Sequence, residues 1–391
     1  MNKREILKAR RETRGCENIV HFNNAGASLI SSPVADYLYD FLTEEEMIGG
    51  YETAATRAEE LEGFYAVAAK LLNAHPDEIA FIENATRAWD MVFYALPFGP
   101  NDRILTTKSE YGSNIIAYLH RAKQTGAELI VIDNDEHGQI DIQQLQESID
   151  ERVKLIAISH IPTGGGLVNP AREVGKVAKK NGIPFLLDAC QSVGQMALNV
   201  QDLACDFLSA TGRKYLRAPR GTGFLYVKRN WIDKLEPPLI DQYAAELIDR
   251  HNYVLRQDAR RFENWERYFA GQATLGKAIE YAMAFGLKKI QKRIFELADQ
   301  LRQELHAIPE IEVTDQGIEK CGIVTFRSDC ASAKHIKATL GAEGINVSVS
   351  SGSGMRLSFV DRGLDEVVRA SLHYYNTKDE LERFLSVIKR I

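Results

Sequence analysis

The stretch Pro184-Phe185-Leu186-Leu187-Asp188-Ala189-Cys190-Gln191 decides the fold, because a short apolar run ends there on an acid. A second polar turn, Thr211-Gly212-Arg213-Lys214, follows it and ends on a lysine. The spacing lets the acid and the amine meet at the edge of a parallel sheet, where α/β proteins bind ligands. We therefore expect an α/β protein in which a charged aromatic cofactor sits between these two groups.

Asp188 and Lys214 together suggest pyridoxal phosphate chemistry. A lysine amine can hold the cofactor aldehyde as a Schiff base and later move protons. A carboxylate opposite the ring nitrogen keeps the pyridinium charged. A lysine alone is weak evidence, since most lysines carry a solvated surface charge. The neighbouring motifs therefore decide this interpretation.

The composition predicts a globular protein of two domains, with 391 residues of which 45% are hydrophobic. The formal net charge of −6 gives no general attraction to nucleic acid or to an anionic membrane, so we expect neither partner. The charged start, Met1 to Arg14, lacks the apolar core of a secretion signal, and no run is long enough to span a membrane. No cysteine belongs to a CxxC pair or a zinc-like cluster, which favours free thiols in a reducing cytoplasm. The cysteines are Cys16, Cys190, Cys205, Cys321 and Cys330.

Apolar runs alternate with helix-like stretches, which indicates βαβ units and a mostly parallel sheet. The predicted buried strands are 79–82, 103–106, 129–132, 155–158 and 184–187. The run Phe224–Val227 adds a strand that we expect to be antiparallel.

A smaller α/β unit is predicted toward the C-terminus. A long charged amphipathic helix begins at about Tyr281, and the runs 322–326 and 355–359 follow it. We place the large domain at 21–284, and the small domain at 1–20 and 285–391. Because no Pro/Gly/Ser linker separates them, the domains are expected to pack tightly.

Five motifs in this order resemble the class V aminotransferase family of fold-type I pyridoxal phosphate enzymes, from about Asn23 to the C-terminus. They are Glu83-Asn84-Ala85-Thr86, Asp188-Ala189-Cys190-Gln191, Ala210-Thr211-Gly212-Arg213-Lys214, Arg220-Gly221-Thr222-Gly223 and Val368-Arg369-Ala370-Ser371. The family includes cysteine desulfurases, selenocysteine lyases, isopenicillin N epimerase-like proteins and the C–S lyase of ergothioneine synthesis. The chain is most similar to the last two branches. The resemblance implies pyridoxal 5′-phosphate as cofactor, a large domain with a mostly parallel sheet, and a smaller C-terminal α/β domain.

The resemblance assigns cofactor-phosphate contacts to Asn84, Ala85, Thr86, Thr211 and Arg213. Backbone N–H groups at the start of a helix near Arg87 can bind the phosphate anion. Asn and Thr are also common as ordinary N-cap residues, which is the alternative interpretation. Most related desulfurases carry histidine where Arg213 stands.

Around the cofactor ring, Tyr111 takes the position of a stacking aromatic group, although it also reads as a buried core tyrosine. Desulfurases use a histidine there, and a phenol with a pKa near ~10 is a poorer base at neutral pH. Thr163 and Gln191 match groups near the phenolic oxygen of the cofactor. The run Gly164-Gly165-Gly166 lacks dinucleotide-site spacing and is interpreted as a tight turn, or else a plain loop.

For the substrate, Arg369 matches the arginine that binds the α-carboxylate through its guanidinium fork. Without the resemblance, Arg369 would be interpreted as a surface arginine. The resemblance also implies Asn23 and Ala25 as substrate-binding residues, and Arg356 as a contact to a second acidic group.

A nucleophilic cysteine, which desulfurases carry in the loop before this arginine, is absent from 347–368. Cys321 and Cys330 lie upstream and are interpreted as buried structural thiols. Persulfide transfer is therefore disfavoured.

The preferred hypothesis is an enzyme that acts on a small amino acid through a Cα carbanion, with Lys214, Asp188 and Tyr111 as catalytic residues. A C–S lyase that performs β-elimination on a cysteine derivative is favoured. A class V aminotransferase, an amino-acid epimerase, a persulfide-forming desulfurase and a non-catalytic cofactor-binding protein are the alternatives. A dinucleotide-dependent dehydrogenase would need a glycine fingerprint after the first strand, and none is found.

The resemblance further implies a homodimer whose sites take residues from both subunits. The segment Arg260–Trp265 matches the one that reaches the neighbour's phosphate, so Trp265 is expected near the cofactor of the partner chain. A capped helix start with a buried tryptophan is the alternative.

Overall fold

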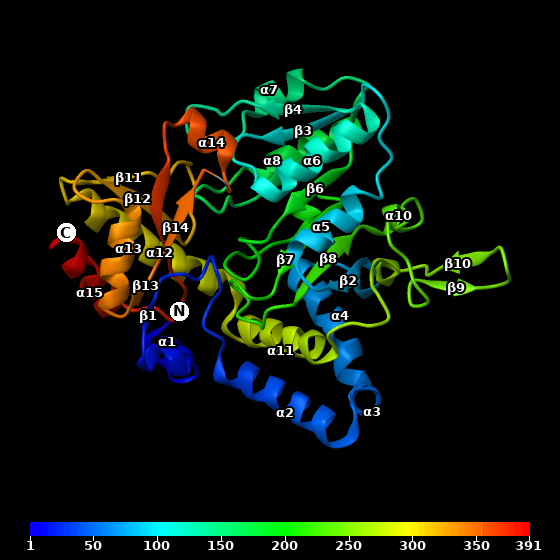
Figure 1. Cartoon of the computed structure of the whole chain (residues 1–391), viewed down its shortest axis with the longest axis horizontal. Helices are drawn as coiled ribbons and strands as arrows, with labels where there is room; N and C mark the ends of the chain where they lie inside the picture. The colour runs from blue at the N-terminus through cyan, green and yellow to red at the C-terminus, as the bar shows by residue number, and fades with distance from the viewer. Residues whose placement is uncertain (353) are drawn as a thin grey trace.

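The computed structural model describes residues 1–352 and 354–391. Within them, a large α/β unit surrounds a seven-stranded sheet, and a smaller unit surrounds a four-stranded sheet (Figure 1). Along the large sheet the order is β2 (Ile79–Ile82), β8 (Gly223–Val227), β7 (Phe207–Thr211), β6 (Phe185–Asp188), β5 (Val153–Ser159), β3 (Arg103–Thr107) and β4 (Glu128–Ile132).

The pairings confirm a mostly parallel sheet. Strands β4, β3, β5, β6 and β7 pair in parallel. Strand β8 is antiparallel to both β7 and β2, as expected for the run Phe224–Val227. All five predicted buried strands are present: 79–82 has the predicted bounds, and the bounds of the other four shift by one or two residues.

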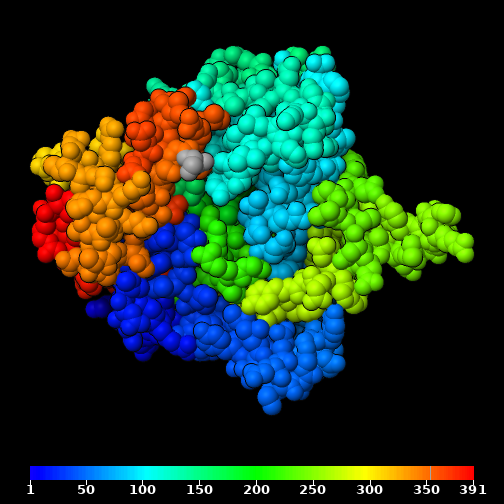
Figure 2. Space-filling view, viewed as in Figure 1, coloured from blue at the N-terminus to red at the C-terminus, as the bar shows by residue number. Residues whose placement is uncertain are grey.

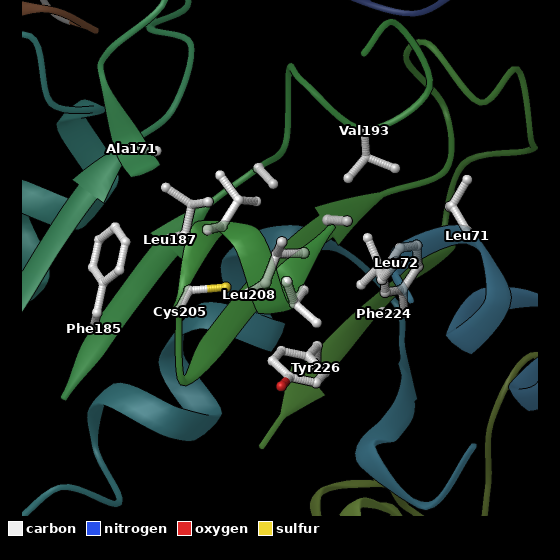
Figure 3. Packing of buried hydrophobic residues seen from close by; sticks show 14 of the residues in the cluster. Leu71, Leu72, Ala171, Phe185, Leu187, Val193, Cys205, Leu208, Phe224 and Tyr226 are labelled. Carbon is white, nitrogen blue, oxygen red and sulfur yellow. The ribbon is translucent and has the colours of Figure 1, made fainter. Parts of the chain in front are cut away.

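Helices cover both faces of the large sheet. They are α4 (Ala58–Leu72), α5 (Ala85–Phe93), α6 (Gly112–Thr125), α7 (Ile142–Glu147), α8 (Ala171–Asn181), α9 (Val200–Leu203), α10 (Arg229–Ile232) and α11 (Phe269–Phe285). Successive residues of β6 point to opposite faces. Leu187 packs in one core with Leu208 and Phe224 (Figure 3), and Leu186 packs in the other with Trp89. Burial on both faces explains why these strands read as nearly continuous apolar runs.

The smaller unit has an antiparallel sheet in the order β11 (Ile311–Val313), β12 (Ile323–Ser328), β15 (Glu366–Ser371) and β14 (Ser348–Ser351). It packs with α12 (Leu287–His306), α13 (Ala333–Ala342) and α15 (Lys378–Ile388). The N-terminal strand β1 (Val20–His21) pairs with β13 (Ile345–Asn346) beside this unit, and α1 (Lys3–Arg11) precedes it. The numbered domain boundaries stay a prediction.

Two predicted elements differ in the structure. The helix expected from about Tyr281 is divided, because Gly286 has a φ of 87° and separates α11 from α12. The run 355–359, expected within the small α/β unit, forms the helix α14 (Arg356–Asp361) rather than a strand of its sheet. Met355 and Phe359 stand four residues apart and bury in one small apolar cluster, which is a helical spacing.

Apolar side chains are exposed along α2 (Ser32–Ile48), α3 (Gly50–Thr56) and the hairpin of β9 (Ala245–Leu247) and β10 (Tyr253–Leu255). The hairpin projects from the body of the molecule at the right of Figure 2. In the described part of the chain, no helix is long and apolar enough to cross a membrane.

Candidate functional site

A cavity of about 300 Å³ lies where β2, β5, β6 and β7 end. It contains most of the residues that the sequence singled out for the cofactor. Those that line it are Asn84, Ala85, Thr86, Tyr111, Thr163, Asp188, Gln191, Thr211, Arg213 and Lys214. The sheet edge therefore collects groups that are far apart in the sequence.

Lys214 and Asp188 are both buried in this cavity. Burial lowers the pKa of the Lys214 amine, and its Nζ atom lies 3.2 Å from the Cys190 Sγ atom. Burial raises the pKa of Asp188, while the Cys190 N–H at 2.9 Å, the Lys214 charge and the Asn114 amide lower it. The amine is thus closer to losing its proton at neutral pH than an exposed lysine would be.

The first turn of α5 lines one end of the cavity. Asn84 is its N-cap and accepts a hydrogen bond from the Arg87 N–H at 3.0 Å, so the ordinary cap is present. Arg213 Nη1 is buried without a hydrogen-bond partner among the described residues. A helix N-terminus beside an unused guanidinium N–H suits a phosphate group. The Thr211 hydroxyl already donates to the Thr222 carbonyl at 3.3 Å.

Arg369, on β15, is only 7% exposed and reaches the same region from the smaller sheet. Its Nη1 donates to the Thr163 carbonyl at 3.0 Å and to the Thr163 hydroxyl at 2.7 Å, and its Nη2 donates to Asn23 Oδ1 at 3.2 Å. Its Nε has no partner among the described residues. A forked cation held by neutral acceptors can bind a carboxylate.

Gln191 connects the Arg369 guanidinium to the cavity, because both side chains donate to the Thr163 hydroxyl. Its Nε2 donates to the Thr163 hydroxyl and to the Ala25 carbonyl, each at 3.1 Å. Its Oε1 is buried without a partner in the part of the chain described, and is free to accept from a ligand.

Of three further predicted site residues, one lines the cavity and two lie outside it. Tyr111 lines the cavity and is 36% exposed, so it is not a buried core tyrosine. Arg356 is exposed at the start of α14 and does not line the cavity. Trp265 is 46% exposed, beside Tyr243, and lies outside the cavity of its own chain.

The cysteines are free thiols, as expected. Cys321 is buried, and burial raises the pKa of its thiol to about 12. Cys330 is exposed, so its interpretation as a buried thiol was wrong; it follows the end of β12 in a loop. Among the described residues, no group of three or more His, Cys, Asp or Glu could hold a metal ion.

Four residues that lie in or next to the site were not predicted from the sequence: Glu110, Asn114, Ser159 and Cys190. Cys190 and Ser159 line the cavity, and Glu110 and Asn114 are buried behind Asp188. Glu110 follows an apolar strand, as Asp188 does, and Asn114 stands four residues later. An acid after an apolar strand was the one local signal for Glu110, and its partners Asn114 and Ser159 become apparent only from the strand order.

The donor set fits a flat cationic ring that carries a phosphate. Buried polar atoms without partners in the described residues, Arg213 Nη1 and Gln191 Oε1, belong to side chains that line the cavity. Lys214, with its amine, and Asp188, with its carboxylate, line the same cavity. These are the complements that pyridoxal phosphate requires.

Comparison with known proteins agrees with this fit. The family model for class V aminotransferases matches residues 20–384. A protein named probable cysteine desulfurase from Pyrococcus abyssi is 29% identical over 385 residues, which cover 96% of this chain and 94% of that protein. One of the same name from Halalkalibacterium halodurans is 32% identical over 315 residues, covering 78% and 75%. Among solved structures, the apo cysteine desulfurase of Thermococcus onnurineus superposes with a TM-score of 0.92 at 27% identity, covering 98% of this chain and 97% of that one.

The family resemblance and the fold class expected from the sequence are confirmed, because the family match extends over nearly the whole chain and the architecture is that of fold type I. The expected closer similarity to the epimerase-like and C–S lyase-like branches stays a prediction, since these relatives carry the name cysteine desulfurase. The chain therefore belongs to the class V aminotransferase family and is an enzyme whose cofactor is pyridoxal 5′-phosphate.

Proposed function

We propose that the enzyme cleaves the C–S bond of cysteine or a cysteine derivative by β-elimination. The observation that carries this proposal is the buried amine of Lys214 in one cavity with Asp188, next to the forked guanidinium of Arg369. Chemistry at Cα of an α-amino acid needs these three groups: a base for the Cα proton, an acid that would partner the ring nitrogen of the cofactor, and a cation for the substrate carboxylate.

Each residue has a separate task in this proposal. Arg369 binds the α-carboxylate through N–H groups of its fork and orients the Cα–H bond toward Lys214. The amine of Lys214, whose pKa burial lowers, takes the proton from Cα. Asp188 stays ionised and keeps the ring nitrogen protonated. Bound pyridoxal phosphate supplies the electron sink for the pair released at Cα.

The route after proton removal depends on the leaving group. In β-elimination the Cα–H and Cβ–S bonds break, the sulfur leaves as a thiol, and hydrolysis of the remaining fragment gives pyruvate and ammonia. Tyr111 stands where related desulfurases are expected to carry histidine, and the stretch 347–368 contains no cysteine to accept sulfur. Both features favour elimination over persulfide transfer.

Persulfide formation is the second candidate, because the relatives at 27–32% identity carry the name cysteine desulfurase. Cys190 is the thiol that lines this cavity, and burial raises its pKa, which makes it a poor thiolate. An aminotransferase or epimerase would use the same residues without breaking the C–S bond.

The test incubates the loaded enzyme with cysteine, cysteine conjugates, cysteine sulfoxides and ordinary amino acids, and measures pyruvate, ammonia, alanine and keto acids. Elimination predicts equal amounts of pyruvate and ammonia from a sulfur-containing substrate. Alanine with enzyme-bound sulfur would establish the desulfurase, and a keto acid without ammonia would establish the aminotransferase.

We also propose a homodimer in which Trp265 of one chain lies near the cofactor of the other. The exposed position of this indole, outside the cavity of its own chain, supports that arrangement. The apolar hairpin of β9 and β10 beside it supplies surface of the kind that subunits bury.

A further inference from the structure

Glu110 is a buried carboxylate that no step of the proposed reaction uses. It follows β3 and is 2% exposed. Its Oε1 accepts hydrogen bonds from the Tyr111 N–H at 2.7 Å, the Asn114 amide at 2.9 Å and the Ser159 hydroxyl at 2.5 Å. Its Oε2 accepts from the Ser159 N–H at 2.9 Å and the Thr106 hydroxyl at 3.2 Å. All of these donors are neutral.

Asn114 joins this carboxylate to Asp188. The Asn114 Nδ2 atom lies 2.9 Å from Glu110 Oε1 and 3.1 Å from Asp188 Oδ2. An amide nitrogen carries two hydrogens, so one is available for each acid. Ser159 pairs with Asp188 in the register of β5 and β6, which holds Glu110 beside the end of the neighbouring strand. The two acids therefore form one unit across the ends of β3, β5 and β6.

The chain itself supplies little positive charge to this unit. Within residues 1–352 and 354–391, no side-chain cation forms an ion pair with either carboxylate at 4.0 Å or less. Burial raises the pKa of Glu110 to about 7, and the charge of Asp188 acts in the same direction. Buried carboxylates with only neutral donors are costly unless a cation compensates them.

We propose that Glu110 is a positioning residue for Asp188 and carries a second negative charge that favours the protonated ring nitrogen of the cofactor. The proposal rests on the role proposed above for Asp188, and it is independent of which substrate the enzyme takes. Glu110 fixes Asp188 through Asn114, whose amide would otherwise be free to turn.

A proton balance follows from this arrangement. The titratable groups that face Glu110 are Asp188 from β6 and Tyr118 from α6, with Lys214 beyond Asp188. Tyr118 stays neutral, because burial holds its pKa well above the ordinary value. A cationic ring nitrogen favours the ionised form of Glu110, so a proton held at neutral pH leaves to solvent when the cofactor binds.

The experiment compares wild type with Glu110→Gln, which keeps the shape of the side chain and removes its charge. Cofactor binding to the apoprotein is measured at pH 7 by calorimetry in PIPES and in HEPES, which do not compete for the phosphate position, so that the difference in heat gives the number of protons released. We expect fewer protons released by Glu110→Gln, binding about tenfold weaker, and a lower pH for the loss of the ring-protonated absorption band.

Glu78→Gln is the matched control, since Glu78 is also buried and accepts backbone N–H bonds but does not line the cavity. It should bind the cofactor like wild type. Equal proton release by wild type and Glu110→Gln would overturn the proposal, and so would equal affinity. Wild type that takes up no cofactor would instead contradict the role proposed for Asp188.

If Glu110→Gln does not fold, Asn114→Ser takes its place, because it keeps Glu110 and removes the bridge. The proposal then requires weaker binding and a shifted absorption band in Asn114→Ser. Binding and a band that match wild type would overturn it.

Discussion

At the scale of single residues, burial sets the charge states on which the site depends. The same low-polarity surroundings lower the pKa of the Lys214 amine and raise the pKa of the Asp188 carboxyl. Both shifts disfavour the charged forms, which are the ammonium of Lys214 and the carboxylate of Asp188. A cationic ring placed between them restores a partner to the acid and lets the amine act uncharged.

Lys214→Ala removes the covalent tether and the proton carrier together. Turnover should fall by roughly 1,000-fold or more and the absorption band of the lysine-bound cofactor should disappear, while circular dichroism stays unchanged. Lys176→Ala, on the exposed side of α8, is the control and should behave like wild type. Normal turnover in Lys214→Ala would exclude its proposed role.

Arg369→Ala should raise KM about tenfold or more and leave the cofactor spectrum normal, because its fork is placed for the substrate carboxylate. Arg369→Lys keeps the charge but loses the fork, so its KM should lie between that of wild type and that of Arg369→Ala. Steady-state kinetics and absorption spectra measure both. A variant that loses the cofactor and keeps its substrate affinity would contradict this assignment.

Glu110 makes the stability of the apoprotein depend on pH. Its carboxyl has a pKa of about 7 when folded against a model value of 4.5, so the folded state holds more protons between these two values. Relative to Glu110→Gln, wild type should therefore lose up to about 3 kcal/mol of unfolding free energy as the pH rises through that window. Urea denaturation at about pH 5 and about pH 8 measures the difference. Parallel stability curves would show that the carboxyl does not titrate there.

Residue types that bind a cofactor could be found from the sequence, because each stands in a local motif beside a strand end. Asn84, Asp188 and Lys214 are of this kind. Glu110 and Asn114 were not assigned, since their importance arises from contacts with Ser159 and Asp188 across three strands. Such contacts depend on strand order, which local patterns do not give.

At the scale of elements, the run Gly164–Gly166 brings the loop after β5 against the smaller sheet. An added Cβ at Gly166 would lie 2.7 Å from the Ile323 carbonyl oxygen, a backbone atom of β12. At Gly165 the nearest atoms would be 3.9 Å away. The close approach of β12 explains why residue 166 is a glycine, but it does not explain the glycine at 165.

Gly166→Ala should cost about 1–3 kcal/mol of unfolding free energy, because the backbone of β12 has to move. Gly165→Ala is the matched control and should cost less than about 1 kcal/mol. Chemical denaturation of both variants measures the difference. Equal losses would show that the loop tolerates a shift away from β12.

Apolar runs predicted strands well where both faces of the sheet are covered, as in β5 and β6. The same approach did not resolve 355–359, where Met355 and Phe359 meet on one side of the helix α14. A short apolar run is compatible with either a helix or a strand, and the tertiary environment decides between the two.

At the scale of the whole molecule, exposed apolar groups suggest an interface. Leu247 is 78% exposed at the hairpin, Met47 is 74% exposed in α2, and Trp265 is 46% exposed. Soluble monomers rarely carry so much apolar surface without a partner.

Wild type should therefore sediment as a dimer, and Leu247→Glu should shift it toward monomer with weaker cofactor retention. Leu7→Glu, at the exposed leucine of α1, is the control and should remain dimeric. Trp265→Ala should keep the dimer and lower cofactor retention. A fully active monomer would defeat the proposed assembly.

The pairing of β1 with β13 also has a consequence for synthesis on the ribosome. Val20 meets Ile345, and Phe22 is fully buried in the core that α12 and α15 complete. The segment around Val20 and Phe22 therefore keeps its apolar side chains uncovered until the much later helices α12 and α15 have emerged. Long-range contacts of this kind slow folding and expose intermediates to aggregation. Although it is synthesised well before α12 and α15, the segment of β1 becomes native only with them, and its docking completes the smaller core.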